Sequence, residues 1–520
     1  MSSDELGTER GPLRRALAAG RDLVLVRFVV LRTLGLVYFA AFLSNALQIV
    51  PLVGAHGLLP AAPAVDHLVQ TSGRLGAFRQ LPSLFVFTGV SDTALLVASW
   101  LGVLLSLAVM LGATNAVVMV VLWGLYMSLE HVGQTFFAFG WEIQILETGL
   151  LAAFLCPVKT WRPFPKAPPS PIAIGLFRWL VVRVMLGSGL IKLRGDACWR
   201  DLTCLDHHFE TQPIPGPLSP MFHHLPHVVH AAGVLFNFVA ELVAPFFAFG
   251  PRRARLAAAV VMIGFQIVLI SSGNLAFLNW LTLVPALACL DDRALARILP
   301  RRIVQWAKRE TIEDEPTRAS LWASGGYALV VVVLSIAPIS NLVSARQEMN
   351  ASYEPLHLVN TYGAFGGVNE VRYEVILEGT LSEDPDDPGA EWRPYELSSK
   401  PGALDKPLTW ITPYHRRLDW QMWFLPFGTA EDNPWFIHLV AELLAGTKEA
   451  RALFVRDPFP ERPPRFIRAD LYVYRFSSDP NRVWDRDFAA PYLQPTRLED
   501  AALTTYLTRR GLSVGAPTAE

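Results

Sequence analysis

The densest group of reactive side chains in the first half of the chain lies in a polar segment at residues 194–227. Cys198 and Cys204 are six positions apart within it. A structural disulfide that closes a short loop is the favoured interpretation if the segment faces an oxidising compartment. A redox-active pair is the alternative, although the CxxC spacing typical of such pairs is missing.

Six histidines gather in and just after the same segment. Metal ligation is one interpretation, but the HExxH and His-x-His spacings are absent. Hydrogen-bonding or interfacial histidines are therefore the favoured interpretation, and no metal site is predicted. The six residues are His207, His208, His223, His224, His227 and His230.

Ionisable residues also occur inside long apolar stretches, where they are costly and therefore informative. Glu147, Arg183 and Glu241 lie near the middle of three such stretches. A buried ion-pair network that holds three helices together is the favoured interpretation, and a polar cavity that binds a ligand is the alternative. Lys192 stands at the end of the Arg183 stretch. It either extends its ammonium to the membrane surface or, with a lowered pKa, acts as a catalytic base.

The last third of the chain is rich in aromatic side chains. Tryptophan clusters form protein cores more often than interfaces. The segment 418–427 is nevertheless largely apolar and interrupted by proline. A surface that docks on the bilayer or on a client protein is therefore also predicted. The candidate client-binding residues are Trp420, Trp423, Phe424, Trp435 and Phe436.

Hydropathy predicts the elements that position these residues. Hydrophobic residues make up 52% of the 520 residues and charged residues only 18%, whereas a soluble domain has nearer a quarter of charged residues. Most apolar residues fall in blocks long enough to cross about 30 Å of hydrocarbon. The sequence therefore predicts an α-helical polytopic membrane domain over residues 24–342. About nine transmembrane helices are expected, at 24–44, 92–111, 113–130, 141–156, 172–193, 228–249, 255–273, 275–290 and 322–342.

Loop charge predicts the orientation of this domain. With nine spans, one set of segments carries sixteen Lys and Arg residues, and the opposite inter-span loops carry four. Because basic loops stay on the cytoplasmic side, the N-terminal tail at 1–23 is predicted to be cytoplasmic. The outer loop at 194–227 and everything after residue 342 then face the periplasm, the cell exterior or an organelle lumen.

Residues 343–496 are predicted to form a β-rich α+β soluble domain on the non-cytoplasmic side, followed by a loosely attached tail at 497–520. Apolar and charged residues alternate over 371–377, which predicts a half-buried strand. A helix is predicted to begin at Asn433-Pro434 and to end at Gly446. The other expected strands lie at 357–362, 392–397 and 466–476.

Familiar soluble-enzyme chemistry is unsupported. The chain has no P-loop, no GxGxxG between a strand and a helix and no HExxH, so no cofactor is predicted. The formal net charge is −1, and no nucleic-acid partner is expected. The lipid bilayer is the expected partner of the apolar blocks.

Several long segments, in the same order along the chain, resemble the lipase maturation factors. These are membrane proteins of the endoplasmic reticulum in animals, with bacterial relatives. The segments resemble that family's fourth span, its large lumenal loop with both cysteines, its seventh and eighth spans and its C-terminal domain. They are QTFFAFGWEIQILETGLLAAFLCP (134–157), GLIKLRGDACWRDLTCLDHHFETQP (189–213), SGNLAFLNWLTLVPALACLD (272–291), NTYG (360–363), LDWQMWF (418–424) and NPWF (433–436).

The resemblance implies a chaperone-like maturation factor for exported client proteins such as lipases, rather than an enzyme. It implies that residues 343–490 contact the client, with the contact centred on 418–436. The Arg- and Ala-rich composition and the short termini are typical of a bacterial protein. The expected location is therefore the bacterial cytoplasmic membrane.

The N-terminal spans also resemble, more distantly, the membrane domain shared with vitamin K-dependent γ-glutamyl carboxylases. In that group the proposed catalytic base is a Lys in the setting Gly-x-x-Lys-Leu-x-x-Asp, which Gly189, Lys192, Leu193 and Asp196 match. This resemblance implies an alternative function, a membrane enzyme with a cavity at Lys192 and a quinone-like or lipid substrate. A structural membrane scaffold with a binding β domain is the third hypothesis.

Overall fold

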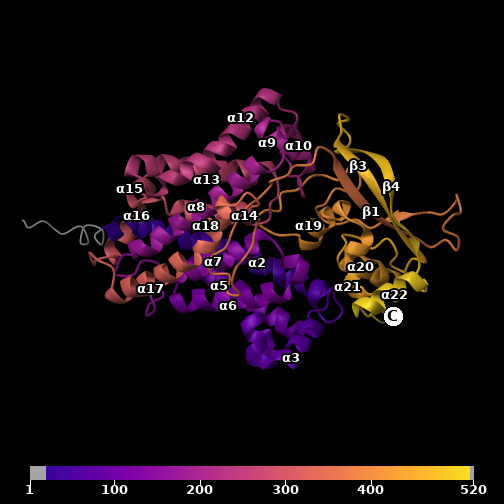
Figure 1. Ribbon diagram of the computed structural model, residues 1–520, viewed down its shortest axis with the longest axis horizontal. Coiled ribbons are helices and arrows are strands. Elements are labelled where there is room, and N and C mark those ends of the chain that lie inside the picture. Colours follow the sequence, from indigo (N-terminus) through magenta and orange to yellow (C-terminus); the bar gives the residue numbers. More distant parts are fainter. Residues whose placement is uncertain (1–18, 516–520) are drawn as a thin grey trace, which may run out of the picture.

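The chain folds into a helical bundle that carries a smaller, sheet-containing part at one end (Figure 1). The structure is a computed structural model and describes residues 19–515. Residues 1–18 of the predicted N-terminal tail and 516–520 of the predicted C-terminal tail lie outside the described residues. The predicted fold class, a helical membrane domain plus a C-terminal domain with both strands and helices, is confirmed.

A helix occurs at each of the nine predicted spans. Within residues 19–515, six helical segments are long and apolar enough to cross a membrane. The other three predicted spans coincide with shorter helices, so the number of nine crossings stays a prediction. The long segments are α2 (Val24–Val53) after η1 (Ala19–Leu23), α5 (Asp92–Leu111), α8 (Pro171–Arg194), α12 (His227–Phe238) with η3 (Val239–Val243) and η4 (Ala244–Phe249), α13 (Arg252–Ser272), and α17 (Arg318–Leu334) with α18 (Ile336–Val343). The shorter helices are α6 (Ala116–Val132), α7 (Gly140–Ala153) and α14 (Leu278–Leu287).

Helix α7 lies inside the bundle, where it contacts α2, α6, α8 and α14. Its 14 residues extend about 21 Å at the rise of an α-helix, which is less than the hydrocarbon thickness of about 30 Å. Nearly all of its side chains are buried. A short helix is tolerated at this depth because protein, rather than lipid, surrounds its ends. Polar side chains on α7 must therefore find partners within the protein.

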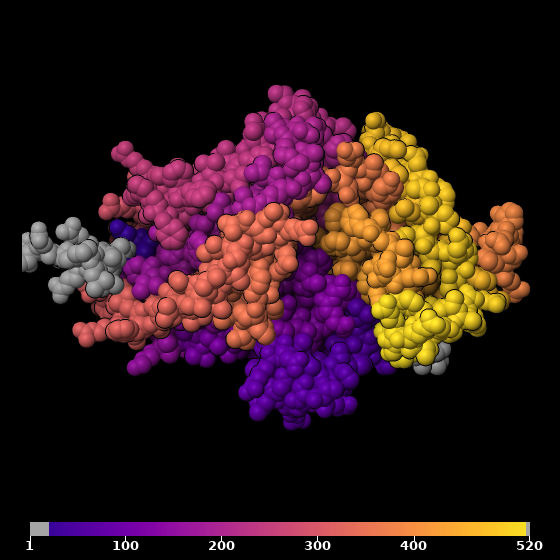
Figure 2. All heavy atoms as spheres, in the orientation of Figure 1, coloured from indigo at the N-terminus to yellow at the C-terminus, as the bar shows by residue number. Residues whose placement is uncertain are grey.

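Short helices occupy the connections between the long ones. In the predicted loop 45–91, the residues around α3 form a lobe at the lower edge of the space-filling view (Figure 2). The predicted outer loop 194–227 folds into three short helices rather than an extended loop. The connecting helices are α3 (Ala62–Gln80), α4 (Phe85–Thr88), η2 (Gln134–Phe137), α9 (Ala197–Arg200), α10 (Cys204–Thr211), α11 (Ser219–His223), α15 (Asp292–Leu295) and α16 (Arg301–Glu310).

An antiparallel sheet with the strand order β2-β1-β3-β4 forms the frame of the C-terminal part. Strand β1 (Arg372–Thr380) pairs along its length with β3 (Phe466–Phe476), which pairs in turn with β4 (Trp484–Thr496); β2 (Arg393–Pro394) is a short edge strand. Helix α19 contacts both β1 and the η2 turn of the bundle, so it lies between the two parts (Figure 1). The helices are α19 (Arg417–Trp423), η5 (Leu425–Phe427), η6 (Ala430–Asp432), α20 (Pro434–Ala445), α21 (Lys448–Arg451) and α22 (Ala501–Arg510).

The strand at 466–476 and the helix Pro434–Ala445, which ends at the left-handed Gly446, are confirmed. The predicted alternation in the first strand is wrong, because Arg372 and Glu374 are buried and Tyr373 is exposed. Arg372 pairs with Glu374 and also donates to backbone carbonyls of the 210–213 segment. Charged side chains with this many partners can replace apolar ones in a core.

Two further differences concern the sheet. Residues 357–362 form an irregular segment instead of a strand. A single bridge links Asn360 to Ser352, and the Asn360 backbone also bonds to Glu147 and Arg183 of the bundle. Strand β4 falls within the predicted domain but was not predicted as a strand. Most of its residues are exposed or half-buried, so it has little of the alternation that marks a strand facing a core.

Candidate functional site

Lys192 is buried, so the predicted extension of its ammonium to a membrane surface is wrong. Its Nζ donates to Glu241 Oε1 at 2.6 Å and to Asn237 Oδ1 at 3.2 Å. Asn237 also donates to the second carboxylate oxygen of Glu241 at 2.9 Å. The predicted network of three residues is therefore divided, because Glu241 pairs with Lys192 whereas Glu147 pairs with Arg183.

Local backbone features bring Lys192 and Glu241 together. Glu241 lies in η3, a single π-helical turn. Pro245, four residues later, has no N–H to donate to the Glu241 carbonyl, which accounts for the interruption of the α-helix at this point. Gly189, one turn before Lys192, allows η3 to approach α8, since a Cβ at this position would lie 2.6 Å from the side chain of Leu242. The Gly-x-x-Lys spacing thus has a packing explanation.

A cavity of about 410 Å³ borders this ion pair and is lined by residues of α8, α12, α13 and α14. Its volume falls within the range of about 300–1,000 Å³ that small-molecule sites have. His208 from α10 also lines the cavity. Burial, assisted by the nearby Lys192 ammonium, lowers the pKa of His208 to about 4, so this imidazole is neutral at physiological pH. The cavity at Lys192 that the enzyme hypothesis requires is present, whereas the role of Lys192 as a base stays a prediction.

Glu147 and Arg183 connect the bundle to the C-terminal part. Their side chains form a buried ion pair between α7 and α8. Arg183 also donates to the Asn360 carbonyl at 2.7 Å, and the Glu147 carboxylate accepts hydrogen bonds from the Asn360 N–H at 3.1 Å and the Tyr362 hydroxyl at 2.7 Å. The predicted partners therefore do pair, and they also hold an incoming segment of the chain.

Helix α7 carries a second buried carboxylate, Glu142, that sequence reasoning missed. Arg417 donates to Glu142 Oε1 at 2.9 Å, to the Phe136 carbonyl at 2.7 Å and to Asn45 Oδ1 at 2.9 Å. The Arg417 and Glu142 side chains are both 0% exposed. The sequence did contain a signal for this site, because Glu142 is a second Glu in the same apolar stretch, five residues before Glu147. Each carboxylate of α7 thus binds a different segment of the C-terminal part.

Comparison with known proteins explains this arrangement of two connected parts. The family model of the lipase maturation factor transmembrane domain matches residues 25–297, and that of the lipase maturation factor C-terminal domain matches residues 358–494. The chain belongs to the lipase maturation factor family. Its sequence is 44% identical to mouse Lipase maturation factor 1, over 92% of this chain and 88% of that protein. Its sequence is 43% identical to human Lipase maturation factor 1, over 95% of this chain and 91% of that protein.

A second group of relatives is less similar. Human Lipase maturation factor 2 is 29% identical over 95% of this chain and 85% of its own length. No solved structure matches the chain. The family match and the long apolar helices together make this lipase maturation factor an integral, multi-pass membrane protein.

Cys198 and Cys204 of this lipase maturation factor are joined in a disulfide. Trp199 lies between them, with its ring centre 5.3 Å from Lys192 Nζ and its N–H donating to the Phe365 carbonyl at 2.9 Å. Cys204 is fully buried. The disulfide loop therefore packs beside the cavity, which favours a structural role over a redox role.

Three members of the predicted histidine group lie near carboxylates of α10 instead of converging on one point. His227 and His230 approach the two oxygens of the Asp206 carboxylate at 2.9 and 2.7 Å. His223 lies 3.8 Å from Glu210. These contacts agree with the favoured hydrogen-bonding interpretation.

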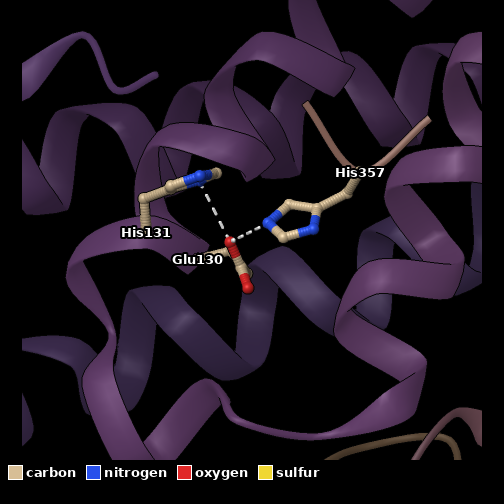
Figure 3. Close-up of side chains that lie close together, drawn as sticks. All are labelled: Glu130, His131 and His357. Carbon is tan, nitrogen blue, oxygen red and sulfur yellow. Dashed lines mark ion pairs between the residues drawn. The ribbon is translucent and has the colours of Figure 1, made fainter. Parts of the chain in front are cut away.

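A Glu-His-His group that sequence reasoning missed joins the end of α6 to the segment before β1 (Figure 3). Glu130 Oε2 lies 3.0 Å from His131 Nδ1 and 3.5 Å from His357 Nε2. Three atoms of ligand type within 4.8 Å of one another have the spacing of a metal site. However, His131 Nδ1 lies 2.8 Å from the Met127 carbonyl and must donate to it, so this nitrogen is not available as a ligand. The contacts are those of a shared carboxylate that links two segments.

Three of the five predicted client-binding residues are not on a surface. Trp420, Trp435 and Phe436 are buried. Trp420 packs edge-on against Trp141 of α7, and Trp435 against Phe136 of η2. The prediction is wrong for these three, because Trp420 and Trp435 fill the contact between the two family domains and Phe436 packs against Tyr492 inside the C-terminal domain.

Trp423 and Phe424 are half-buried. Together with Phe427, which is 53% exposed, they line a hollow of about 280 Å³ whose other side includes His208 and Thr211 of α10. The Trp423 indole donates to the Thr211 carbonyl at 3.0 Å. This hollow, the Trp423 groove, is therefore formed by both family domains.

Proposed function

We propose that this lipase maturation factor helps exported lipases to reach their active fold. The observation that carries the proposal is its identity of 44% and 43% to mouse and human Lipase maturation factor 1, which extends over nearly the whole of each chain. Similarity this extensive includes both family domains. It supports a shared role more strongly than a shared fold does alone.

The client is proposed to contact the Trp423 groove. Aromatic side chains in a partly buried hollow are typical anchors at protein interfaces. Phe427 offers an exposed ring at its edge, and Trp423 is held in place by its hydrogen bond to Thr211. A client bound here would contact both family domains.

The proposed location is the bacterial cytoplasmic membrane, with the N-terminus in the cytoplasm and the C-terminal domain outside it. The excess of Lys and Arg in one set of loops supports this orientation. Gly389→Cys and Lys308→Cys variants test it, because both positions are exposed and lie on opposite predicted sides. A membrane-impermeant maleimide should label only the first in intact cells, and labelling of only the second would reverse the orientation.

The test of function is deletion of the gene in the native host, followed by measurement of secreted lipase activity per amount of lipase protein. The deletion should lower this specific activity, and the wild-type gene should restore it. Phe427→Ser should restore it poorly, whereas Phe488→Ser, at a 58% exposed position on β4, should restore it fully. Unchanged specific activity after deletion would refute the lipase role. Equal restoration by the two variants would refute the groove as the contact.

A further inference from the structure

The cavity beside Lys192 opens toward the outer surface of α12 and α13. Among its lining residues, Val229, Ala232 and Phe236 of α12 and Val268 of α13 are exposed. All four are apolar, and their helices belong to segments long enough to cross a membrane. Asn350 is the one exposed polar residue of the described lining. An opening bordered by apolar side chains on such helices faces lipid, so a ligand would enter sideways from the bilayer.

The buried part of the cavity lining includes polar side chains with matched charges. The Lys192 ammonium and the Glu241 carboxylate compensate each other at 2.6 Å, and Asn237 bonds to both. The neutral imidazole of His208 is 5% exposed, and its ring nitrogens bond to no group within residues 19–515. It lines the cavity and so offers a polar side chain with no hydrogen-bond partner in the described part of the chain. Buried polar groups of this kind are normally hydrogen-bonded.

These features together define a ligand class. We propose that the cavity binds one neutral amphiphile from the bilayer, with its apolar chain between α12 and α13 and its hydroxyl or carbonyl head on His208 and the Lys192–Glu241 pair. An ionised head would add an uncompensated charge to a buried site, which is costly. A neutral head group adds no charge, and its hydrogen bonds to water are replaced by hydrogen bonds to the protein. His208 and Phe365 line both this cavity and the Trp423 groove, but the proposal does not depend on the lipase role, because it is tested by lipid labelling alone.

Photolabelling of the full-length protein in detergent micelles tests the proposal. The probe is a monoacylglycerol with a diazirine in its chain, and the competitors are unlabelled monoacylglycerol, fatty acid and alkylammonium of equal chain length. Label should appear on peptides of α12 and α13. The monoacylglycerol should compete about tenfold or more better than either charged amphiphile, which corresponds to about 1.4 kcal/mol.

Matched variants separate the cavity from the lipid-facing surface. Ala232→Trp should narrow the opening and reduce labelling about tenfold or more. Leu235→Trp is the control, because Leu235 is 52% exposed on the same helix but does not line the cavity. Both substitutions lie on an exposed face, and thermal melting checks that each variant is folded. Equal labelling of the two variants would overturn the proposal.

Glu241→Gln tests the charge argument. It leaves the Lys192 ammonium without a carboxylate, so the preference should shift from monoacylglycerol toward the fatty acid by about tenfold. If this variant does not fold, the Ala232→Trp comparison still decides the location of the site. A wild-type protein that prefers the fatty acid, or label spread evenly over all lipid-facing helices, would refute the neutral-ligand site.

Discussion

Arg417 offers the sharpest test of how the two family domains are held together. The substitution Arg417→Met keeps the length of the side chain and removes the guanidinium. The Glu142 carboxylate would then lose the hydrogen bond of 2.9 Å from Arg417 in a site where both side chains are 0% exposed. Removal of one partner from a buried ion pair costs about 3–5 kcal/mol, because the other charge stays buried without compensation.

A double substitution separates charge from packing. Arg417→Met with Glu142→Gln removes both charges, so it should be more stable than Arg417→Met alone. We expect a coupling energy of about 2–3 kcal/mol between the two positions, within the range for residues in contact. The double variant still lacks the hydrogen bond from Arg417 to the Phe136 carbonyl, which costs about 1–3 kcal/mol.

The assay is denaturant titration in detergent micelles, with a thiol-reactive dye that reports exposure of the free cysteines Cys156 and Cys289. Arg416→Met is the matched control, since the neighbouring Arg416 is half-buried and has no ion pair with any described residue. It should change the free energy of unfolding by about 1 kcal/mol or less. The argument would fail if Arg417→Met cost no more than the control, or if the double variant were as unstable as Arg417→Met.

Three other perturbations test separate parts of the structure. Tyr362→Phe removes a 2.7 Å hydrogen bond to the Glu147 carboxylate and should lower the free energy of unfolding by about 1.5–3 kcal/mol, measured by the same titration. Replacement of Cys198 and Cys204 by Ser opens a loop with a sequence separation of 6 and should cost about 2 kcal/mol; no change in melting temperature would contradict this. The raised folded-state pKa of His438 stabilises the protein below the unfolded pKa of about 6.5, and this contribution is lost as pH rises through the folded pKa. The melting temperature of wild type should therefore exceed that of His438→Asn more at pH 6 than at pH 9, and an equal difference at both would refute this linkage.

The His438 effect follows from its partners. Burial opposes the charged imidazole, but the Glu442 carboxylate and the carbonyls of Leu58 and Ser513 outweigh burial and raise the pKa of His438. The Nδ1–H donates to Leu58 at 2.9 Å, and Nε2 lies 3.1 Å from Glu442. His438 thus joins the segment after α2 to the C-terminal domain.

The sequence was sufficient to predict contacts whose signal is local. A charge in an apolar span needs a partner at a similar depth, which is why Glu147 and Arg183 could be recognised. The helix at Pro434 and the strand at 466–476 follow from capping and composition within a few residues. The fold class follows from the length of the apolar blocks.

Contacts between distant segments could not be predicted in this way. Lys192 stands at the end of an apolar block, and no local feature shows that the π-helical turn of η3 brings Glu241 to it. Arg417 lies in a polar stretch far along the chain, where one sequence gives no indication that the segment enters the bundle. Burial of Trp420 likewise depends on the surface that α7 provides.

The two carboxylates of α7 have a consequence for hybrid proteins made from members of this family. The helical domain ends at Val343, so this residue is the obvious fusion point for joining the C-terminal part of one member to the helical domain of another. Such a hybrid would place foreign side chains opposite Glu142 and Glu147. It would assemble only if the transplanted part supplied the groups that Asn360, Tyr362 and Arg417 supply here. For recombination, α7 therefore belongs with the C-terminal domain, although it lies among the helices of the membrane domain.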